Sequence, residues 1–375
     1  MDQIDLRGLP FERLRAETDA LGLPAFRAKQ LFSWLHQRRA KDFSEMTDLP
    51  KALRERLSAR YHLANVSIER KLVSAKDGTV KYLYALEDGE HVEGVRMSYR
   101  RGGSLCISTQ CGCRMGCTFC ASTLTGLSRS LSASEMLMEV YLAAEDAEAS
   151  GDKIASVVLM GIGEPLDNFD SVMDFLTLVA SEQGFNMGMR HISLSTCGLV
   201  DQIDRLAEKK LQLTLSVSLH APNDEIRRRT MPVARRWPLD ELIRACRHYF
   251  DVTGRRISFE YALIDGVNDA PEHAAELIRL LKGTGSHVNL IPVNRVTETG
   301  YRRSKREKVD AFCKLLNEGG INATVRRELG TDINAACGQL RRGAMGFAMA
   351  NEASGGAGRA PAQEGGSGDS VDSGG

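Results

Sequence analysis

The feature that most constrains the fold is an alternation of strand-like and helix-like segments between residues 105 and 327. Short, mostly apolar segments are separated by longer segments with helical periodicity. Strands separated by helices form right-handed βαβ units, which build a parallel sheet. Six or seven such units predict an α/β fold with an open or partial barrel, in which function collects at the C-terminal strand ends. The expected strands are residues 105–109, 156–160, 191–196, 213–220, 257–264, 287–293 and 323–327.

Two smaller units precede this region, and a polar tail follows it. Residues 1–65 show helical periodicity and predict an accessory helical domain. Residues 66–98 contain strand-like segments with Asp-Gly turns, which predict a short β meander that links the helical domain to a barrel core at 99–345. Residues 346–375 are rich in glycine and serine, and we expect them to be disordered.

The charge balance does not exclude a polyanionic partner. The 375 residues include 49 Lys and Arg against 49 Asp and Glu, so the formal net charge is zero. Residues 351–375 hold one basic and four acidic residues, which leaves 48 basic against 45 acidic side chains on residues 1–350. No apolar run approaches the roughly 18 residues of a membrane span, and the acidic N-terminus lacks a secretory signal. We therefore expect a cytoplasmic protein with reduced thiols and no membrane partner.

Five of the nine cysteines fall between residues 106 and 120. Cys113-x3-Cys117-x2-Cys120 directly follows the first expected strand and offers three thiolates on one loop. Three close thiolates suit either zinc or an iron–sulfur cluster. A structural zinc site needs a fourth ligand, for which Cys111 is a weak candidate. A 4Fe–4S cluster with three ligands keeps one iron open, as reductive cleavage of S-adenosylmethionine requires.

Small and polar residues follow the later expected strands. The segment GIGEPLDN at 161–168 brings glycines, which let a ligand approach the backbone, and a carboxylate. The next strand ends carry serine, histidine and asparagine, where a barrel presents its ligand. The candidate binding residues are Gly163, Glu164, Ser195, Ser218, Leu219, His220 and Asn294. By itself, His220 is more typical of a hydrogen-bonded structural histidine than of a ligand contact.

The motifs together resemble the radical S-adenosylmethionine RNA methyltransferases of the RlmN/Cfr family over about residues 5–342. They are LCISTQCGCRMGCTFC, GIGEPL, SLHAPND, FEYALIDGVND, HVNLIPVN and AACGQL. The resemblance implies a partial (β/α)6-type radical-SAM barrel with a 4Fe–4S cluster on Cys113, Cys117 and Cys120. It also implies that S-adenosylmethionine binds at the strand ends, and that a donor such as flavodoxin or a ferredoxin supplies electrons.

Within this family, two types of enzyme methylate different ring carbons of adenosine. The RlmN type acts on carbon 2 in 23S ribosomal RNA, at the peptidyl-transferase centre, and on the adenosine 3′ of the anticodon in transfer RNAs. The Cfr type acts on carbon 8 and confers antibiotic resistance. FEYALIDGVND and MPVARRWPLDEL resemble the carbon-2 type more closely, whereas the cysteine loop is compatible with both. We therefore expect carbon-2 methylation, with carbon 8 as the alternative.

The resemblance also implies roles for three residues outside the cysteine loop. Cys337 would accept a methyl group from one S-adenosylmethionine as an S-methylcysteine intermediate. A second S-adenosylmethionine would yield the radical that activates this methyl group for addition to adenine. Cys106 would then resolve the adduct through a transient disulfide with Cys337, and Glu93 would accept a proton. The simpler interpretations are a buried hydrophobic cysteine for Cys106 and a solvated strand position for Glu93.

A target base can reach a barrel interior only outside its stack, so a looped or single-stranded adenosine is the expected substrate. The helical segment 1–60, with 12 basic and 9 acidic residues, is either a packing module or an RNA contact. An alternative function is a zinc-dependent RNA-binding module without catalysis. Several arginine clusters are candidates for phosphate contact, namely Arg100-Arg101, Arg227-Arg228-Arg229, Arg235-Arg236, Arg255-Arg256, Arg302 to Arg306, Arg326-Arg327 and Arg341-Arg342.

Overall fold

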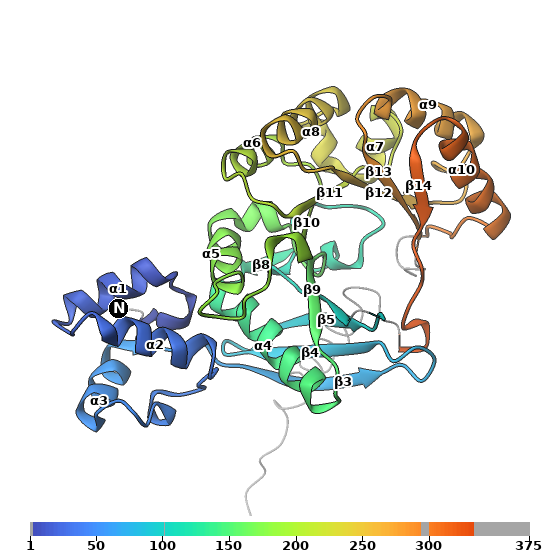
Figure 1. Ribbon diagram of the computed structural model, residues 1–375. Coiled ribbons are helices and arrows are strands. Elements are labelled where there is room, and N and C mark those ends of the chain that lie inside the picture. Colours follow the sequence, from blue (N-terminus) through green and yellow to red (C-terminus); the bar gives the residue numbers. More distant parts are fainter. Residues whose placement is uncertain (1–2, 101, 294–299, 334–375) are drawn as a thin grey trace, which may run out of the picture.

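The computed structural model describes residues 3–100, 102–293 and 300–333. A ten-stranded sheet forms its centre, in the order β14-β13-β12-β11-β10-β9-β6-β5-β4-β3 (Figure 1). Strand β6 and strands β9 to β14 are parallel neighbours in chain order, which confirms the partial α/β barrel. These strands are β6 (Gly103–Cys106), β9 (Ile154–Leu159), β10 (Ile192–Thr196), β11 (Thr214–Ser218), β12 (Ser258–Leu263), β13 (His287–Pro292) and β14 (Asn322–Val325).

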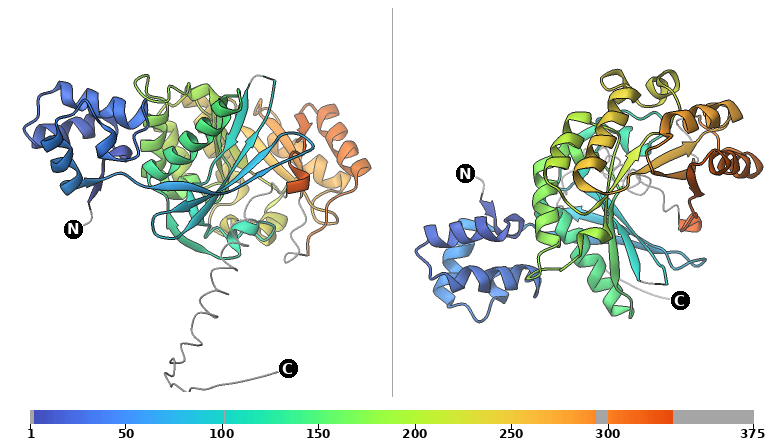
Figure 2. Two further views of the ribbon diagram at one scale, coloured as in Figure 1. Left: turned by 90° about the horizontal axis from the view of Figure 1, so that it is seen from below. Right: turned by 45° about the horizontal axis from the view of Figure 1, so that its top comes forward.

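Helices cover the outer face of the curved sheet (Figure 2). Alternate strand residues explain this arrangement: in β10, Ile192 and Leu194 are fully buried, whereas Ser193 and Ser195 are half-buried. The apolar set packs under the helices and the small polar set faces the barrel interior. The covering helices are α4 (Ala133–Ala149), α5 (Phe169–Val179), α6 (Val200–Glu208), α7 (Asp224–Thr230), α8 (Leu239–Thr253), α9 (Pro271–Leu281) and α10 (Arg306–Glu318).

The expected meander belongs to the same sheet. Strands β3 (Val66–Val73), β4 (Val80–Leu86) and β5 (His91–Met97) are antiparallel, and β5 pairs with β6. Tyr82 and Tyr84 of β4 face α4, because their hydroxyl groups donate to Asp146 Oδ2 at 2.8 Å and to the Glu139 carbonyl at 3.1 Å. The intervening residues of β4 therefore point into the barrel.

The N-terminal unit is helical and lies at the side of the barrel (Figure 1). It comprises α1 (Phe11–Ala20), α2 (Phe26–His36) and α3 (Lys51–Arg60), with β1 (Ile4–Asp5) paired to β2 (Tyr61–His62). Buried contacts join it to α4: His36 Nδ1 lies 2.9 Å from the Tyr141 hydroxyl. No helix in the described parts of the chain is long and apolar enough to cross a membrane.

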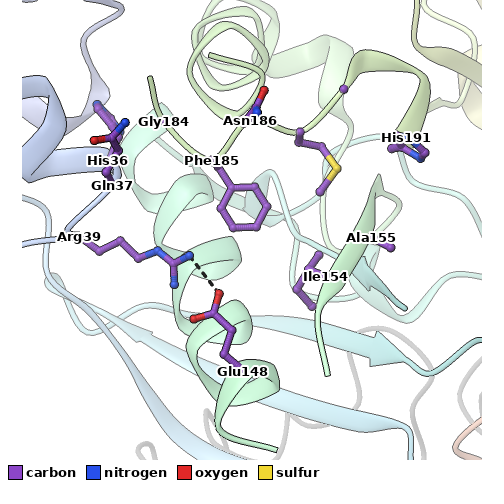
Figure 3. Close-up of a pocket in the computed structure, with 12 residues that line it drawn as sticks. His36, Gln37, Arg39, Glu148, Ile154, Ala155, Gly184, Phe185, Asn186 and His191 are labelled. Carbon is purple, nitrogen blue, oxygen red and sulfur yellow. Dashed lines mark hydrogen bonds and ion pairs between the residues drawn. The ribbon is translucent and has the colours of Figure 1, made fainter. Parts of the chain in front are cut away.

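A cavity of about 430 Å³ lies between this unit and the start of β9 (Figure 3). Arg39 spans its wall, with Nη2 3.3 Å from Glu148 Oε1 and its guanidinium 5.7 Å from the Phe185 ring centre. The cavity lies at the N-terminal end of β9 and is lined by none of the residues predicted to bind a cofactor or a metal.

Candidate active site

A second cavity, of about 210 Å³, opens at the C-terminal ends of the parallel strands. It brings together most of the predicted site residues, namely Cys113, Cys117, Cys120, Gly163, Glu164, Ser195, Ser218 and His220. Leu219 does not line it, because this residue is fully buried and its carbonyl accepts a hydrogen bond from Arg227. Asn294 and Cys337 lie outside the described residues, as does the predicted tail.

A hairpin positions the cysteine loop. Strands β7 (Gln110–Gly112) and β8 (Leu127–Ser130) are antiparallel, and the three cysteines lie between them. Gly112 has φ +89°, and a Cβ there would lie 1.9 Å from the Gly126 carbonyl oxygen. Only glycine therefore fits where the two strands close on the loop.

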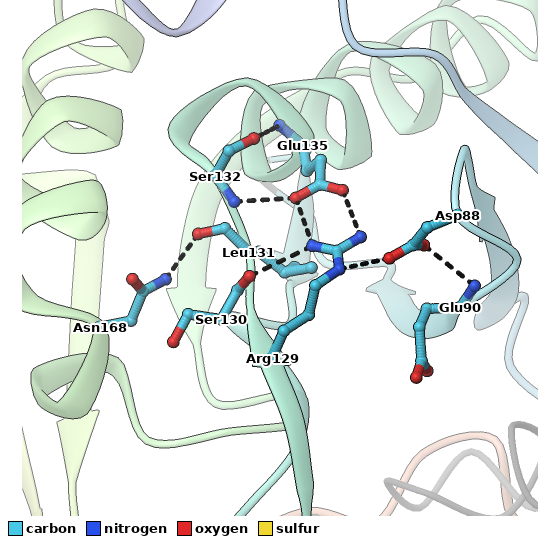
Figure 4. Close-up of polar contacts among 8 residues, drawn as sticks. All are labelled: Asp88, Glu90, Arg129, Ser130, Leu131, Ser132, Glu135 and Asn168. Atoms are coloured by element: carbon cyan, nitrogen blue, oxygen red, sulfur yellow. Dashed lines mark hydrogen bonds and ion pairs between the residues drawn. The ribbon is translucent and has the colours of Figure 1, made fainter. Parts of the chain in front are cut away.

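Arg129 fastens this hairpin to the rest of the barrel (Figure 4). Its guanidinium donates to both Glu135 oxygens, at 2.9 and 2.7 Å, and to Asp88 Oδ2 at 2.5 Å. Glu135 also completes the capping box of Ser132 at the start of α4. The guanidinium lowers the pKa of Asp88. One side chain thus joins β8, the β4–β5 turn and α4.

The three thiols suit an iron–sulfur cluster better than a single ion. Cys113 and Cys117 are buried, and Cys120 is half-buried. Burial raises the pKa of Cys113 to about 12 and raises that of Cys117, so both thiols are protonated until a metal displaces the protons. Among the described residues, no three His, Cys, Asp or Glu side chains converge on one ion position. A 4Fe–4S cluster bonds each cysteine to a different iron, so it needs no such convergence.

Glycines bring the end of β9 against the residues that precede the cysteine loop. A Cβ on Gly161 would lie 2.5 Å from the Ile107 carbonyl oxygen, and one on Gly163 would lie 2.7 Å from Gln110 Cβ. The backbone N–H of Thr109 donates to the Ile162 carbonyl at 2.8 Å. These glycines therefore have a packing role in addition to the ligand contact that the sequence predicts.

Glu164 is buried at the floor of the cavity. Its Oε1 accepts from Leu166 N–H at 3.1 Å, and its Oε2 accepts from Cys197 N–H at 2.7 Å. Burial raises the pKa of this carboxyl group, whereas the hydrogen bonds lower it. The two backbone bonds fix the carboxylate, which has lone pairs left for a cationic ligand.

His220 is neutral and held in one orientation. Its Nδ1 accepts from the Ala262 N–H at 2.9 Å, and burial lowers its pKa to about 3. Because a backbone N–H can only donate, the ring proton sits on Nε2. Phe119 of the cysteine loop packs edge-on to this ring at 4.9 Å. Nδ1 thus has the structural role, and Nε2–H remains available to a ligand.

Glu93 and Cys106 lie on the inner face of the sheet. Val95 is the register partner of Cys106, and two residues earlier on β5 Glu93 shares that face. Glu93 is buried and paired with Lys81 Nζ at 2.9 Å, so it does not occupy a solvated strand face. Ser108 Oγ donates to the Glu93 carbonyl at 2.7 Å and accepts from Ile162 N–H at 3.0 Å. This serine links β5 to the Gly161–Gly163 segment.

One of the predicted RNA contacts, Arg227, is wrong, and another, Arg255, lies far from the cavity. Arg227 is fully buried, and its guanidinium donates to the carbonyls of Cys197 at 2.7 Å and Leu219 at 3.3 Å. It therefore ties together the ends of β10 and β11. Arg255 donates to the Leu213 carbonyl at 3.3 Å, at the start of β11 and so at the opposite end of the barrel from the cavity. The sequence pattern alone does not distinguish such buried cations from surface ones.

Several cavity-lining residues were missed by the sequence analysis, among them Glu260 and Met231. Glu260 on β12 accepts from Asn289 Nδ2 at 2.8 Å and from Ser258 Oγ at 3.2 Å, and burial raises its pKa. Met231 also lines the cavity. Alternation along β12 was the available signal for Glu260, since it shares a face with Ser258.

Comparison with known proteins first defines the class. Residues 107–281 match the model of the radical SAM superfamily, and residues 4–63 match the ribosomal RNA large subunit methyltransferase N-terminal domain. The fold is similar to the crystal structure of a radical SAM methyltransferase from Sphaerobacter thermophilus, with TM-score 0.85 and 44% identity over 90% of this chain and 98% of that one. Fold, cavity and matches together define a radical SAM methyltransferase, a class that uses a cysteine-bound 4Fe–4S cluster and S-adenosylmethionine.

Comparison with curated relatives identifies the family within this class. The chain is 53% identical to a probable dual-specificity RNA methyltransferase RlmN of Alkaliphilus oremlandii, over 91% of this chain and 98% of the relative. It is 50% identical to the protein of the same description from Lachnoclostridium phytofermentans, over 91% and 95%. The chain belongs to the dual-specificity RNA methyltransferase RlmN family and is a radical SAM RNA methyltransferase. This assignment decides against the non-catalytic zinc module.

Proposed function

We propose that this enzyme methylates carbon 2 of adenosine in the cytoplasm. Its substrates are 23S ribosomal RNA, at the peptidyl-transferase centre, and transfer RNAs, at the adenosine 3′ of the anticodon. The observation that carries the proposal is the shared inner face: Glu93 and Cys106 lie beside the strand ends whose cavity holds the three motif cysteines. The description of the relatives as dual-specificity RNA methyltransferases supports two kinds of RNA substrate.

In this proposal Cys113, Cys117 and Cys120 hold the cluster, with flavodoxin or a ferredoxin as electron donor. When bound, the cluster supplies the electron that cleaves S-adenosylmethionine and starts radical chemistry. The fixed Glu164 carboxylate orients the cofactor's amino group. Nε2–H of His220 can donate a hydrogen bond to an acceptor atom of the cofactor. The remaining cofactor contacts come from Gly163, Ser195, Ser218 and Asn294, whereas Leu219 is too deeply buried for the contact predicted from the sequence.

Two molecules of S-adenosylmethionine are used per turnover, because adenine carbon 2 is not nucleophilic and cannot attack a sulfonium directly. Cys337 takes the methyl group of the first by displacement, forming S-methylcysteine. Use of the second removes one hydrogen atom from this methyl group, which leaves within 5′-deoxyadenosine, and the methylene carbon bonds to ring carbon 2. The adduct then loses the proton of ring carbon 2 to Glu93 and one electron to the electron-transfer partner. Cys106 thiolate attacks the Cys337 sulfur and forms a disulfide. The electron pair of the broken sulfur–carbon bond stays on the methylene carbon, which takes up a proton to become the methyl group, and a reductant later restores the two thiols.

The position of the methyl group is the direct test. We expect 2-methyladenosine when 23S ribosomal RNA fragments or transfer RNAs are treated with the reduced, cluster-loaded enzyme, digested and analysed by mass spectrometry. Each RNA is tested separately, and Cys337→Ala enzyme is the control. A product with 8-methyladenosine would contradict the proposal and favour the carbon-8 type. Methylation of only one kind of RNA would contradict the dual specificity.

RNA binding is expected to weaken steeply with salt. Arg228 and Arg229 are exposed on α7, which contacts the cysteine loop through the hydrogen bond from Thr118 N–H to the Thr230 carbonyl. With about four phosphate contacts, the logarithm of the association constant falls with the logarithm of salt with a slope of about −3. Fluorescence anisotropy with a labelled RNA measures this slope.

A matched pair of variants locates these contacts. Arg228→Gln/Arg229→Gln should reduce the salt slope by about 1.4, or about 0.7 per lost contact to single-stranded RNA. Arg247→Gln removes an exposed arginine on α8 and should leave the slope unchanged. A flat salt dependence in the unmodified protein would count against phosphate recognition.

A further inference from the structure

Lys81 is buried beside the Glu93 carboxylate. Its Nζ lies 2.9 Å from Glu93 Oε2, and the two side chains are 1% and 2% exposed. In the antiparallel β4–β5 register, Leu83 is opposite Glu93 and Lys81 is opposite Val95. Lys81 and Glu93 are therefore diagonal neighbours on one face of the sheet.

That face is the barrel interior. The other face of β4 is occupied by Tyr82 and Tyr84, which bond to α4. Val95 is in turn opposite Cys106, so Lys81, Val95 and Cys106 form a row across β4, β5 and β6. The ion pair therefore lies on the same surface as the cysteine proposed to resolve the adduct.

Packing alone does not account for a lysine at this position. Its neighbours on the same face, Leu83 and Val95, are apolar and buried. Taking two charges out of water is costly, and a buried pair of this kind is often no more stabilising than apolar side chains of similar volume. The pair therefore points to a requirement for charge in the reaction.

We propose that Lys81 is a positioning residue for Glu93. The inference rests on the proposed function, in which Glu93 accepts a proton from the adduct of Cys337 and adenine. The ammonium group donates to the carboxylate and fixes its orientation. The proton moves from the adduct carbon to a Glu93 oxygen, and Lys81 keeps its own proton throughout.

The coupling between the two side chains reports on this role. In the described part of the chain, the register places two titratable side chains near Glu93, Lys81 on β4 and Cys106 on β6. If Lys81 acts by holding the carboxylate in place, its removal should slow the reaction only while Glu93 is present. A conservative variant that keeps a hydrogen-bond donor at position 81 should restore the rate.

The experiment measures single-turnover methylation of a transfer RNA by cluster-loaded Lys81→Met, Glu93→Gln and double-variant enzymes. Lys81→Met should lower the rate at pH 7 by about tenfold to a hundredfold, within the contribution of a positioned acid–base group. Lys81→Arg, which keeps a donor to the carboxylate, should recover most of the rate. The double variant should be no slower than Glu93→Gln, because Lys81 acts through Glu93.

The controls separate positioning from folding. Lys71→Met removes a half-exposed lysine that pairs with Asp146 and should leave the rate unchanged. Release of 5′-deoxyadenosine should be normal in Lys81→Met, which reports an intact cofactor site. If Lys81→Met does not fold, Lys81→Arg decides: it keeps a donor to the carboxylate, so it should be faster than Glu93→Gln, and a Lys81→Arg enzyme as slow as Glu93→Gln would overturn the inference.

The outcomes also separate this inference from the proposed function. Normal methylation by Glu93→Gln would overturn the proton-acceptor role itself. A slow Glu93→Gln enzyme together with a Lys81→Met enzyme of normal rate would overturn only the role of Lys81. Additive losses in the double variant would likewise show that Lys81 acts independently of Glu93.

Discussion

Cys106→Ala enzyme is expected to accumulate a covalent adduct with its RNA substrate. The alanine removes the thiolate that would attack the Cys337 sulfur, so the reaction stops after the methyl carbon has bonded to adenine. Methylated product should fall by at least about a hundredfold, as for loss of a positioned reacting group. Denaturing electrophoresis with labelled RNA, followed by mass spectrometry of the cross-linked peptide, measures the adduct and its attachment at Cys337.

A double variant provides the control. Cys106→Ala/Cys337→Ala lacks the attachment point and should form no adduct, although its cluster absorbance should be unchanged. Cys106 is buried on the inner face of the sheet, and alanine fits there with little change in volume. Normal turnover by Cys106→Ala would refute the two-cysteine scheme.

Loss of one motif cysteine is expected to abolish both the methylation of RNA and the cleavage of S-adenosylmethionine, which needs no RNA. Cys117→Ala removes a ligand at the cavity that Cys113 and Cys120 also line. The purified, reconstituted variant should lack the brown cluster absorbance and should release no 5′-deoxyadenosine from S-adenosylmethionine. Its iron content and ultraviolet–visible spectrum measure the effect.

Cys313→Ala is the matched control for that loss. Cys313 lies on α10, half-buried, with its thiol 3.5 Å from the Ala323 carbonyl and outside the residues that line the cavity. This variant should keep normal iron content and activity. A Cys117→Ala enzyme that retained a full cluster and cofactor cleavage would show that the cluster has other ligands.

The barrel and most of its cavity could be predicted because they follow from local periodicity. The seven expected strands all occur in the predicted chain order, and the strand-end residues Glu164, Ser195 and His220 meet in one cavity. Parallel strands joined by helices place their C-terminal ends together whatever the details of packing. These residues could therefore be predicted to lie together although they are far apart in the sequence.

Charge environments could not be predicted in this way. Arg227 stands in a run of three arginines, yet it is buried between strand ends while its two neighbours are exposed. Lys81 and Glu93 are 12 positions apart and become partners only through the β4–β5 register. Such pairs depend on which face of a helix or strand is covered by other elements. A single sequence shows only the alternation of apolar and polar residues, from which the covered face must be inferred.

The Arg129 anchor has a consequence for maturation of the enzyme. The bonds from Arg129 to Asp88 and Glu135 fix the base of the cysteine hairpin without using any of the three motif thiols. The bonds that hold the base of the loop therefore do not depend on a metal. We expect the apoprotein to keep this hairpin and to accept iron and sulfide during reconstitution in vitro.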